Sequence, residues 1–326
     1  MKKKTKIGLI VIALASAGFS WFVFGDQNSE PEPQINEREV EENVDEDGKY
    51  EEDNLIERKD GVEVLDLNAE AAYSIYVEDD ESQVLFSRNR NEKLPVASLT
   101  KLMTALVVYE NYDLSEPIGV PESRYFTDSH LDDLRVFTDT TFEELLYPLL
   151  LESNNSGAYA AATAPEEIGF DDFIDLMNNK ATNLGMTRTI YHNPSGLDTV
   201  RDVNLSTARD IATLVKNLLD IPLFWEIMEK TNYEIHSQRS NLYYLIETTN
   251  KFLDGTYFAY DNTPQWHDDI IGGKTGFTYE AMGCLVMVLE VDGGYIINVV
   301  LGAPGRQERF EEMEKLIDWV YKAYNI

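Results

Sequence analysis

Ser98 and Lys101 lie three residues apart in the stretch PVASLTKLMTAL (95–106), whose apolar residues surround a helical wheel on every side. This pattern is typical of a helix within a core, where an ammonium group needs a polar partner because it is costly to bury. Residues i and i+3 share one helical face, so the two side chains can meet. A lysine whose pKa is lowered by burial can take the proton of a serine hydroxyl, so the pair predicts a nucleophilic serine with a lysine base.

Pro95 precedes the pair and favours a helix start at this point. Ser98 would then lie at the helix N-terminus, among backbone N–H groups that can stabilise an oxyanion. The pattern is weak when taken alone. A serine three residues before a lysine more often reflects a lysine whose stem packs against the core beside a structural serine.

Two further polar motifs follow along the chain. Ser153-Asn154-Asn155 comes directly after a predicted helix that ends in LLLES, and Lys274-Thr275-Gly276 lies on a predicted strand. Each motif alone is typical of a polar loop or a solvated strand end. In this order, S-x-x-K, S-x-N and K-T-G form the motif set of penicillin-binding proteins and class A β-lactamases. The three segments are therefore expected to line one site.

The elements that carry these motifs indicate a mixed fold. Alternating apolar residues predict a β-hairpin from segments 71–77 and 83–87, which an acidic turn joins. Three apolar segments near the C-terminus predict further strands, at 269–278, 283–291 and 294–303. The first and last strands are expected to share one antiparallel sheet.

Helical signals fill the middle of the chain. Capping residues and i, i+3, i+4 apolar spacing predict helices at 140–153, where Thr141 and Glu144 form a capping box, and at 170–185 and 205–220. An amphipathic helix at 310–324 follows the last strand. We therefore expect a helical subdomain inserted between the two halves of the sheet.

The sequence resembles the serine D-alanyl-D-alanine carboxypeptidases, the low-molecular-mass penicillin-binding proteins, over nearly all of residues 71–324. Besides the three motifs, the resemblance includes the segments PVASLTKLMTALVVYE, MTRTIYHNPSGLD, LSTARDIATL and GGKTGFTYEAMGCLV. It implies an α+β fold of the β-lactamase/transpeptidase-like type, an antiparallel sheet flanked by helices with an all-helical subdomain. The active groove would lie where the sheet and the subdomain meet.

The resemblance also implies catalytic roles. Ser98 would attack the carbonyl of the penultimate D-alanine, and Lys101 would accept its proton. Ser153 would relay a proton to the departing amine, while Lys274 would lower the cost of negative charge near it. Asn155 would hydrogen-bond Lys101 and the substrate's peptide group.

Four further residues are implied in substrate binding. Thr275 would contact the substrate's terminal carboxylate, and Gly276 would let the substrate backbone approach closely. The backbone N–H groups of Ser98 and Phe277 would form the oxyanion hole. Arg309 resembles a family arginine near the carboxylate, although a surface arginine that pairs with the glutamates after it would fit the sequence as well. Asn193 and Gly196, from the Asn-Pro-x-Gly-Leu segment, are expected to be structural.

Three functions are compatible with this motif set. The first is a peptidoglycan D,D-carboxypeptidase, or a closely related D,D-endopeptidase, that β-lactams acylate as covalent inhibitors. The second is a β-lactamase, but no E-x-x-L-N segment with a glutamate for the deacylating water lies between the second and third motifs. The third is a non-catalytic penicillin-binding sensor, but only about six residues precede the apolar run that would cross the membrane. The first function is favoured.

The N-terminal sixty residues differ from the rest in composition. A basic start and the apolar run at 7–24 predict a membrane anchor within 1–25, long enough to cross a bilayer of about 30 Å; cleavage as a signal peptide after Ala17 is the alternative. Residues 26–60 are rich in Glu, Asp, Asn and Pro and predict a disordered acidic linker. Residues 61–326 would form the catalytic domain outside the cytoplasm, tethered to the cell membrane or secreted after cleavage.

Composition excludes several other classes of partner. A formal net charge of −32 argues against nucleic acid, which is bound by clustered Lys and Arg. One cysteine, Cys284, excludes an internal disulfide, and four scattered histidines form no HExxH pair. We therefore expect no metal and no cofactor. The oligomeric state has no signal in the sequence.

Overall fold

The computed structural model describes six ranges of the chain: 55–118, 140–164, 168–198, 202–236, 243–257 and 263–326. By its internal contacts the chain divides into two units, Met1–Glu51 and Glu52–Ile326. All of the described residues belong to the second unit. The predicted membrane segment and most of the predicted linker lie outside the described residues. None of the helices within the described ranges is long and apolar enough to cross a membrane.

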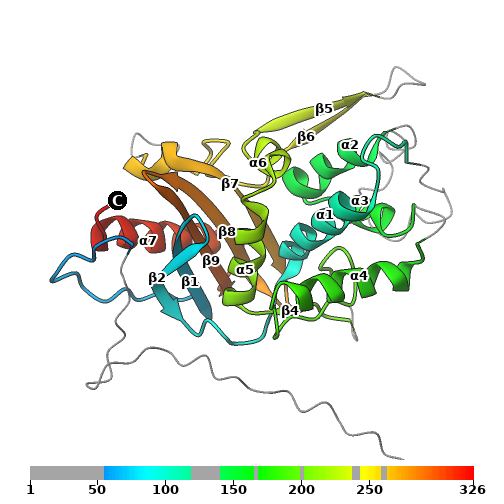
Figure 1. The fold of residues 1–326 in the computed structure, drawn as a ribbon. Coiled ribbons are helices and arrows are strands. Elements are labelled where there is room, and N and C mark those ends of the chain that lie inside the picture. The colour runs from blue at the N-terminus through cyan, green and yellow to red at the C-terminus, as the bar shows by residue number, and fades with distance from the viewer. Residues whose placement is uncertain (1–54, 119–139, 165–167, 199–201, 237–242, 258–262) are drawn as a thin grey trace, which may run out of the picture. The chain divides into compact units, whose positions relative to one another are not determined.

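A single antiparallel sheet joins the beginning and the end of the second unit, as the sequence predicts. Its strand order is β2-β1-β9-β8-β7 (Figure 1). The bounds are β1 Ala71–Glu78, β2 Glu81–Arg88, β7 Ile270–Thr278, β8 Met282–Val291 and β9 Gly294–Ala303. The edge strand β7 carries the K-T-G motif.

Helices cover both faces of this sheet. Successive side chains of a strand point to opposite faces, and in β8 Leu285 and Met287 belong to the hydrophobic cluster with α7 (Glu308–Ala323), whereas Val286 and Val288 belong to the cluster with α5 (Ala208–Leu218). Figure 1 shows α5 and α7 on either side of the sheet. Burial on both faces explains the nearly continuous apolar sequence of β8.

The inserted helical subdomain is confirmed. Its helices are α1 Thr100–Asn111, α2 Phe142–Tyr147, α3 Asn155–Ala161 and α4 Phe170–Asn183, and α6 Pro222–Met228 follows α5. The capping box of Thr141 and Glu144 is present. The helix predicted at 140–153 is shorter than expected, because it changes at Pro148 into a π-helical turn, η4 (Pro148–Glu152). Proline lacks the N–H that a continuing α-helix requires.

Three features of the fold were not predicted. A second hairpin, β5 Asn232–His236 with β6 Tyr243–Glu247, follows α6. Pro95 does not start the nucleophile helix: it lies in the short strand β3 (Leu94–Pro95), which pairs with β4 (Leu205–Ser206). A 3-10 turn, η1 (Ala97–Leu99), connects β3 to α1, so Ser98 still lies at the N-terminal end of the helix.

The end of the predicted linker is folded onto the domain. Leu55 and Ile56 are partly buried against the α7 cluster, and the Gln83 side chain hydrogen-bonds both backbone groups of Ile56. The Lys59 N–H donates to the Ala323 carbonyl, 2.7 Å. Residues 55–60, the end of the predicted linker, therefore fold with the rest of the second unit, because Leu55 and Ile56 pack against its hydrophobic core.

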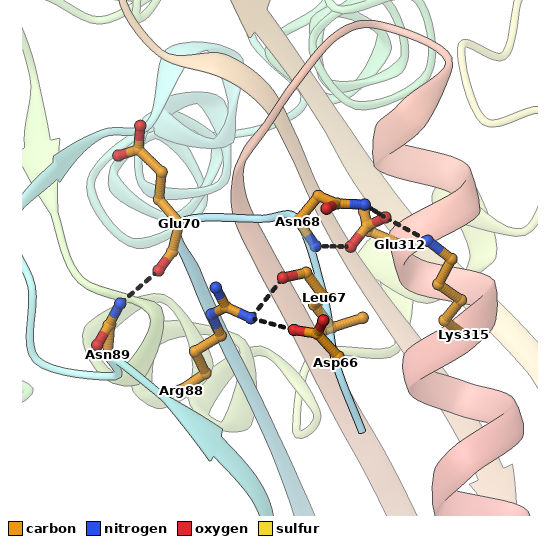
Figure 2. A network of polar contacts seen from close by, with 8 residues as sticks. All are labelled: Asp66, Leu67, Asn68, Glu70, Arg88, Asn89, Glu312 and Lys315. Carbon is orange, nitrogen blue, oxygen red and sulfur yellow. Dashed lines mark hydrogen bonds and ion pairs between the residues drawn. The ribbon is translucent and has the colours of Figure 1, made fainter. Parts of the chain in front are cut away.

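A polar network fixes the segment that leads into β1. The buried Glu312 carboxylate accepts from the backbone N–H of Asn68 at 2.5 Å, from its side-chain amide at 3.3 Å and from Lys315 at 2.6 Å (Figure 2). On the other side of the segment, Arg88 donates to Asp66 and to the Leu67 carbonyl. These contacts tie residues 66–68 to α7 and to β2.

Candidate active site

Ser98 lies in the turn η1, directly before α1. Val96, Ala97 and Leu99 around it are fully buried, so the turn is anchored in the core. Ala97 has a φ of +46°, a left-handed conformation that is unfavourable for a residue with a Cβ. Strain of this kind persists only where the surrounding packing determines the backbone. Here that packing fixes the position of Ser98.

The Lys101 side chain is fully buried and contacts three oxygens. Its Nζ lies 2.9 Å from Ser98 Oγ, 2.7 Å from Asn155 Oδ1 and 2.6 Å from the Ser195 carbonyl oxygen. Burial lowers the Lys101 pKa to about 7, because the charged form loses its hydration. The neutral amine keeps two N–H bonds for Asn155 and Ser195, and its lone pair is then available for the Ser98 proton.

The Ser195 carbonyl reaches Lys101 because the backbone passes unusually close to η1. A Cβ on Gly196 would lie 1.8 Å from the Ala97 carbonyl oxygen, and the φ of Gly196 is +79°. Asn193 holds this turn by accepting from the N–H groups of Ser195 (3.1 Å) and Gly196 (2.7 Å). Asn193 and Gly196 thus have the structural role expected of them. The contact of Lys101 with Ser195 was not predicted.

Ser153 follows η4 and has a left-handed backbone, with φ +68° and ψ 36°. Its hydroxyl is buried and has no hydrogen-bond partner among the described residues. Both features are unfavourable, at about 1–3 kcal/mol each. The structure therefore holds a free hydroxyl in a costly conformation one residue before the N-cap of α3, Asn154, and two residues before Asn155.

The K-T-G strand passes close to the nucleophile. A Cβ on Gly276 would lie 3.1 Å from the backbone nitrogen of Ser98, so the glycine allows β7 to approach η1. This approach brings Ser98 near the part of β7 that includes Phe277, whose backbone N–H was predicted as the second oxyanion donor. The Arg306 guanidinium stacks 4.5 Å from the centre of the Phe277 ring.

Lys274 is fully buried on β7, and its Nζ donates to the Thr275 carbonyl, 3.0 Å. Burial, and then the charges of Lys101 and Arg309, hold the Lys274 pKa well below its usual value. No ion pair joins these three side chains to a carboxylate in the part of the chain that the structure describes. The site is therefore suited to an anionic ligand.

Arg309 belongs to the site and is not a surface residue. Its side chain is buried against β7, where Nη1 donates to the Gly276 carbonyl at 2.8 Å. Burial lowers its pKa to about 10. The alternative pairing with following glutamates is wrong, because Glu312 is occupied by Asn68 and Lys315 and Glu311 points to solvent.

Thr249 is a site residue that sequence reasoning missed. Its hydroxyl lies 2.6 Å from the Thr275 hydroxyl and 3.2 Å from the Leu151 carbonyl. It thereby connects the K-T-G strand to the turn before Ser153. The segment ETTNKFL around it carries no motif, so the sequence offered no signal.

No group of three or more His, Cys, Asp or Glu side chains in the described ranges could hold a metal ion.

Comparisons with known proteins identify a family that the chain resembles over most of its length. The D-alanyl-D-alanine carboxypeptidase family model matches residues 59–305. The D-alanyl-D-alanine carboxypeptidase DacF of Bacillus subtilis is 30% identical over 279 residues, which cover 82% of this chain and 66% of that protein. A D-alanyl-D-alanine endopeptidase of Pseudomonas aeruginosa is 30% identical over 250 residues, 76% of each protein.

A solved structure is similar as well. The cefotaxime-bound penicillin-binding protein D2 of Listeria monocytogenes matches with a TM-score of 0.64 and 29% identity, over 79% of this chain and 99% of that one. The predicted transpeptidase-like α+β fold is thereby confirmed. By the extent of these matches, the chain belongs to the D-alanyl-D-alanine carboxypeptidase family.

Proposed function

We propose that this chain is a penicillin-sensitive serine peptidase that removes the terminal D-alanine from peptidoglycan stem peptides through an acyl-enzyme on Ser98. The observation that carries the proposal is the contact of Ser98 with Lys101, a fully buried amine with a pKa of about 7. Relatives named D-alanyl-D-alanine carboxypeptidases support the substrate, and the cefotaxime-bound relative supports acylation by β-lactams.

In the acylation step, the neutral Lys101 amine accepts the Ser98 hydroxyl proton while the serine oxygen bonds to the carbonyl carbon of the penultimate D-alanine. The backbone N–H groups of Ser98 and Phe277 stabilise the oxyanion that forms. As the C–N bond breaks, the terminal D-alanine keeps the electron pair on its nitrogen. That nitrogen receives a proton from Lys101 through the Ser153 hydroxyl, and Lys101 becomes neutral again.

Hydrolysis of the acyl-enzyme completes the cycle. Lys101 accepts a proton from the attacking water, and the Ser98 oxygen takes up that proton when its bond to the acyl carbon breaks. The net reaction is the hydrolysis of one peptide bond. A β-lactam undergoes the same first step, but its cleaved amide stays attached to the acyl group, so it blocks the approach of water.

The substrate's free carboxylate accounts for the cationic groups around β7. Thr275 can turn its hydroxyl proton from Thr249 to a bound carboxylate, and Lys274 and Arg309 are buried without a carboxylate partner among the described residues. A carboxylate placed there would offset the cost of burying the Lys274 ammonium and the Arg309 guanidinium. Such a site favours a peptide with a free C-terminus.

The decisive experiment incubates the purified full chain with a pentapeptide that ends in D-Ala-D-Ala and measures free D-alanine. Release of D-alanine, together with stoichiometric labelling by a fluorescent penicillin that Ser98→Ala abolishes, is the expected result. Rapid turnover of penicillin with no attack on the peptide would identify a β-lactamase instead. Stable labelling without any peptide cleavage would identify a sensor.

A D,D-endopeptidase activity is the second candidate, because two of the most similar relatives bear that name. The same assay with a crosslinked stem-peptide dimer distinguishes the two. Cleavage of the dimer at a rate comparable to that of the pentapeptide would support the endopeptidase function.

We further propose that residues 1–25 attach the catalytic domain to the outer face of the cell membrane and that the acidic segment after them serves as a spacer. The basic start and the apolar run at 7–24 support this proposal. Fractionation of cells that express the full chain would test it. Recovery of the protein in the medium, with an N-terminus just after Ala17, would show cleavage instead.

A further inference from the structure

We propose that Glu152 and Tyr244 are positioning residues for Ser153, and that they set the rate of Ser98 acylation through it. Neither residue belongs to the three sequence motifs. The inference rests on the proposed function, because acylation of Ser98 is the step that it concerns.

The conformation of Ser153 requires support from its neighbours. Its backbone is left-handed, and its buried hydroxyl has no hydrogen-bond partner among the described residues. Without constraint from its neighbours, a residue with a Cβ would leave the left-handed conformation, and its hydroxyl would turn toward a hydrogen-bond acceptor. Ser153 therefore keeps its position only if the residues on both sides of it are held.

Glu152 holds the C-terminal side of Ser153. Its Oε2 accepts a hydrogen bond from the Asn154 side-chain amide, 3.2 Å. The other end of that amide, Asn154 Oδ1, accepts from the backbone N–H of Gly157 at 2.8 Å and caps α3. Glu152 and α3 thus fix Asn154 from two directions, which restricts the peptide unit that follows Ser153.

Tyr244 holds Glu152 itself. The Tyr244 hydroxyl donates a hydrogen bond to Glu152 Oε1. Both carboxylate oxygens therefore accept from donors, one on the strand β6 and one directly after Ser153. Hydrogen bonds to a charged acceptor are stronger than those between neutral groups, so this arrangement is suited to holding a strained turn.

The hairpin that carries Tyr244 is fixed against the same turn by further contacts. The N–H of Thr249, just after β6, donates to the Leu151 carbonyl at 3.0 Å. The rings of Tyr147 and Tyr233 stack with their centres 3.7 Å apart. Figure 1 shows the β5–β6 hairpin beside α2, the helix that leads into η4. Tyr244 is thus a fixed point and not a mobile side chain.

Two nearly isosteric variants alter the hydrogen bonds from Tyr244 to Glu152 and from Asn154 to Glu152 in different ways. Tyr244→Phe removes only the hydroxyl. Glu152→Gln keeps the shape of the side chain but removes its charge: the amide oxygen can still accept from Asn154, whereas Tyr244 can no longer donate to the second position and must accept from the amide N–H instead. Tyr243→Phe is the matched control. Tyr243 precedes Tyr244 in β6, but its side chain points to solvent and Tyr243 is 63% exposed.

The experiment measures acylation of the full chain by a fluorescent penicillin over a range of concentrations, which separates the acylation rate constant from the binding constant. Both variants are expected to lower the rate constant by about tenfold, with the binding constant and the melting temperature unchanged. The control should match the wild type. Unchanged acylation in both variants would overturn the inference, as would slower acylation that merely parallels a lower melting temperature.

A double-mutant cycle tests whether the effect passes through Ser153. In a Ser153→Ala background, Tyr244→Phe should cause no further loss, because the group that it positions is already absent. An undiminished tenfold loss in that background would contradict the inference. A wild type that penicillin does not label at all would refute the proposed function, whereas a labelled wild type with unaffected variants would refute only this inference.

Discussion

The Lys101 amine lies 2.9 Å from the hydroxyl oxygen of Ser98 and is fully buried. Burial lowers its pKa to about 7, and only the neutral amine can accept the Ser98 proton. The rate of acylation at low penicillin concentration is therefore expected to rise as the pH increases toward 7 and to level off above it. A rate that stays constant from about pH 5.5 to 8.5 would exclude Lys101 as the titrating base.

The burial of Lys101 should also make the free energy of unfolding depend on pH. The Lys101 pKa of the folded protein, about 7, is lower than the value of about 10.4 in an unfolded chain. Between these two values the unfolded state binds more protons, so the free energy of unfolding should rise with pH across this window. Urea unfolding of the wild type and of Lys101→Met, compared at pH 7 and pH 9, isolates this contribution. Equal pH dependence of the two proteins would contradict it.

Replacing Lys101 with Met tests the base directly. Methionine matches the shape of the side chain and carries no buried charge, so the variant should fold. Its acylation by penicillin should fall by about 10²–10⁴-fold, the usual effect of removing a general base. Lys180→Met is the control, because Lys180 pairs with Glu110 on the surface of the helical subdomain. Near-normal acylation of Lys101→Met would remove Lys101 from the mechanism.

Thr249 is expected to orient the Thr275 hydroxyl toward the substrate's carboxylate. The Thr249 hydroxyl donates to the Leu151 carbonyl at 3.2 Å; when substrate binds, it can turn its single proton to Thr275, 2.6 Å away, which frees the Thr275 proton for the carboxylate. Thr249→Val removes this donor and should raise KM for a D-Ala-D-Ala peptide by about tenfold with little effect on kcat. Thr213→Val serves as the control, because Thr213 is half-buried and its hydroxyl donates only to the Arg209 carbonyl within the N-terminal half of α5. An unchanged KM would show that Thr275 is oriented by the substrate alone.

Prediction from the sequence succeeded where side chains carry the signal. The strands at 71–77, 269–278, 283–291 and 294–303 and the capping box at Thr141 follow from residue type and spacing, and the structure has them. Of the motif residues, Ser98 and Asn155 contact Lys101 as expected. The Ser195 contact could not be predicted, since a backbone carbonyl leaves no trace in residue type. Thr249 gave no signal for a related reason: its partner Thr275 lies 26 residues away, and only the fold brings the two together.

Two local elements were missed because tertiary contacts determine them. Each strand of the β5–β6 hairpin has one fully buried apolar residue, Ile235 and Ile246, too few to produce an alternating pattern. The helix at 140–153 has helical periodicity throughout, yet Pro148 converts its last turn into η4. That conversion places Ser153 at a left-handed position, which the apolar pattern of the segment does not indicate.

Gly196 and Gly185 offer a matched test of the close approach between the Ser195–Gly196 backbone and the turn η1 that carries Ser98. Both have a positive φ, +79° and +76°, but a Cβ on Gly196 would lie 1.8 Å from the Ala97 carbonyl oxygen, whereas a Cβ on Gly185 would meet nothing within 4 Å. Gly185→Ala should cost only the left-handed penalty of about 1–2 kcal/mol and leave acylation intact. Gly196→Ala must also displace η1 or the Ser195 turn, so it should destabilise the protein by about 4 kcal/mol or more, or abolish acylation. Equal losses in the two variants, measured by urea unfolding and penicillin labelling, would mean that the contact of Gly196 with Ala97 does not position Ser98.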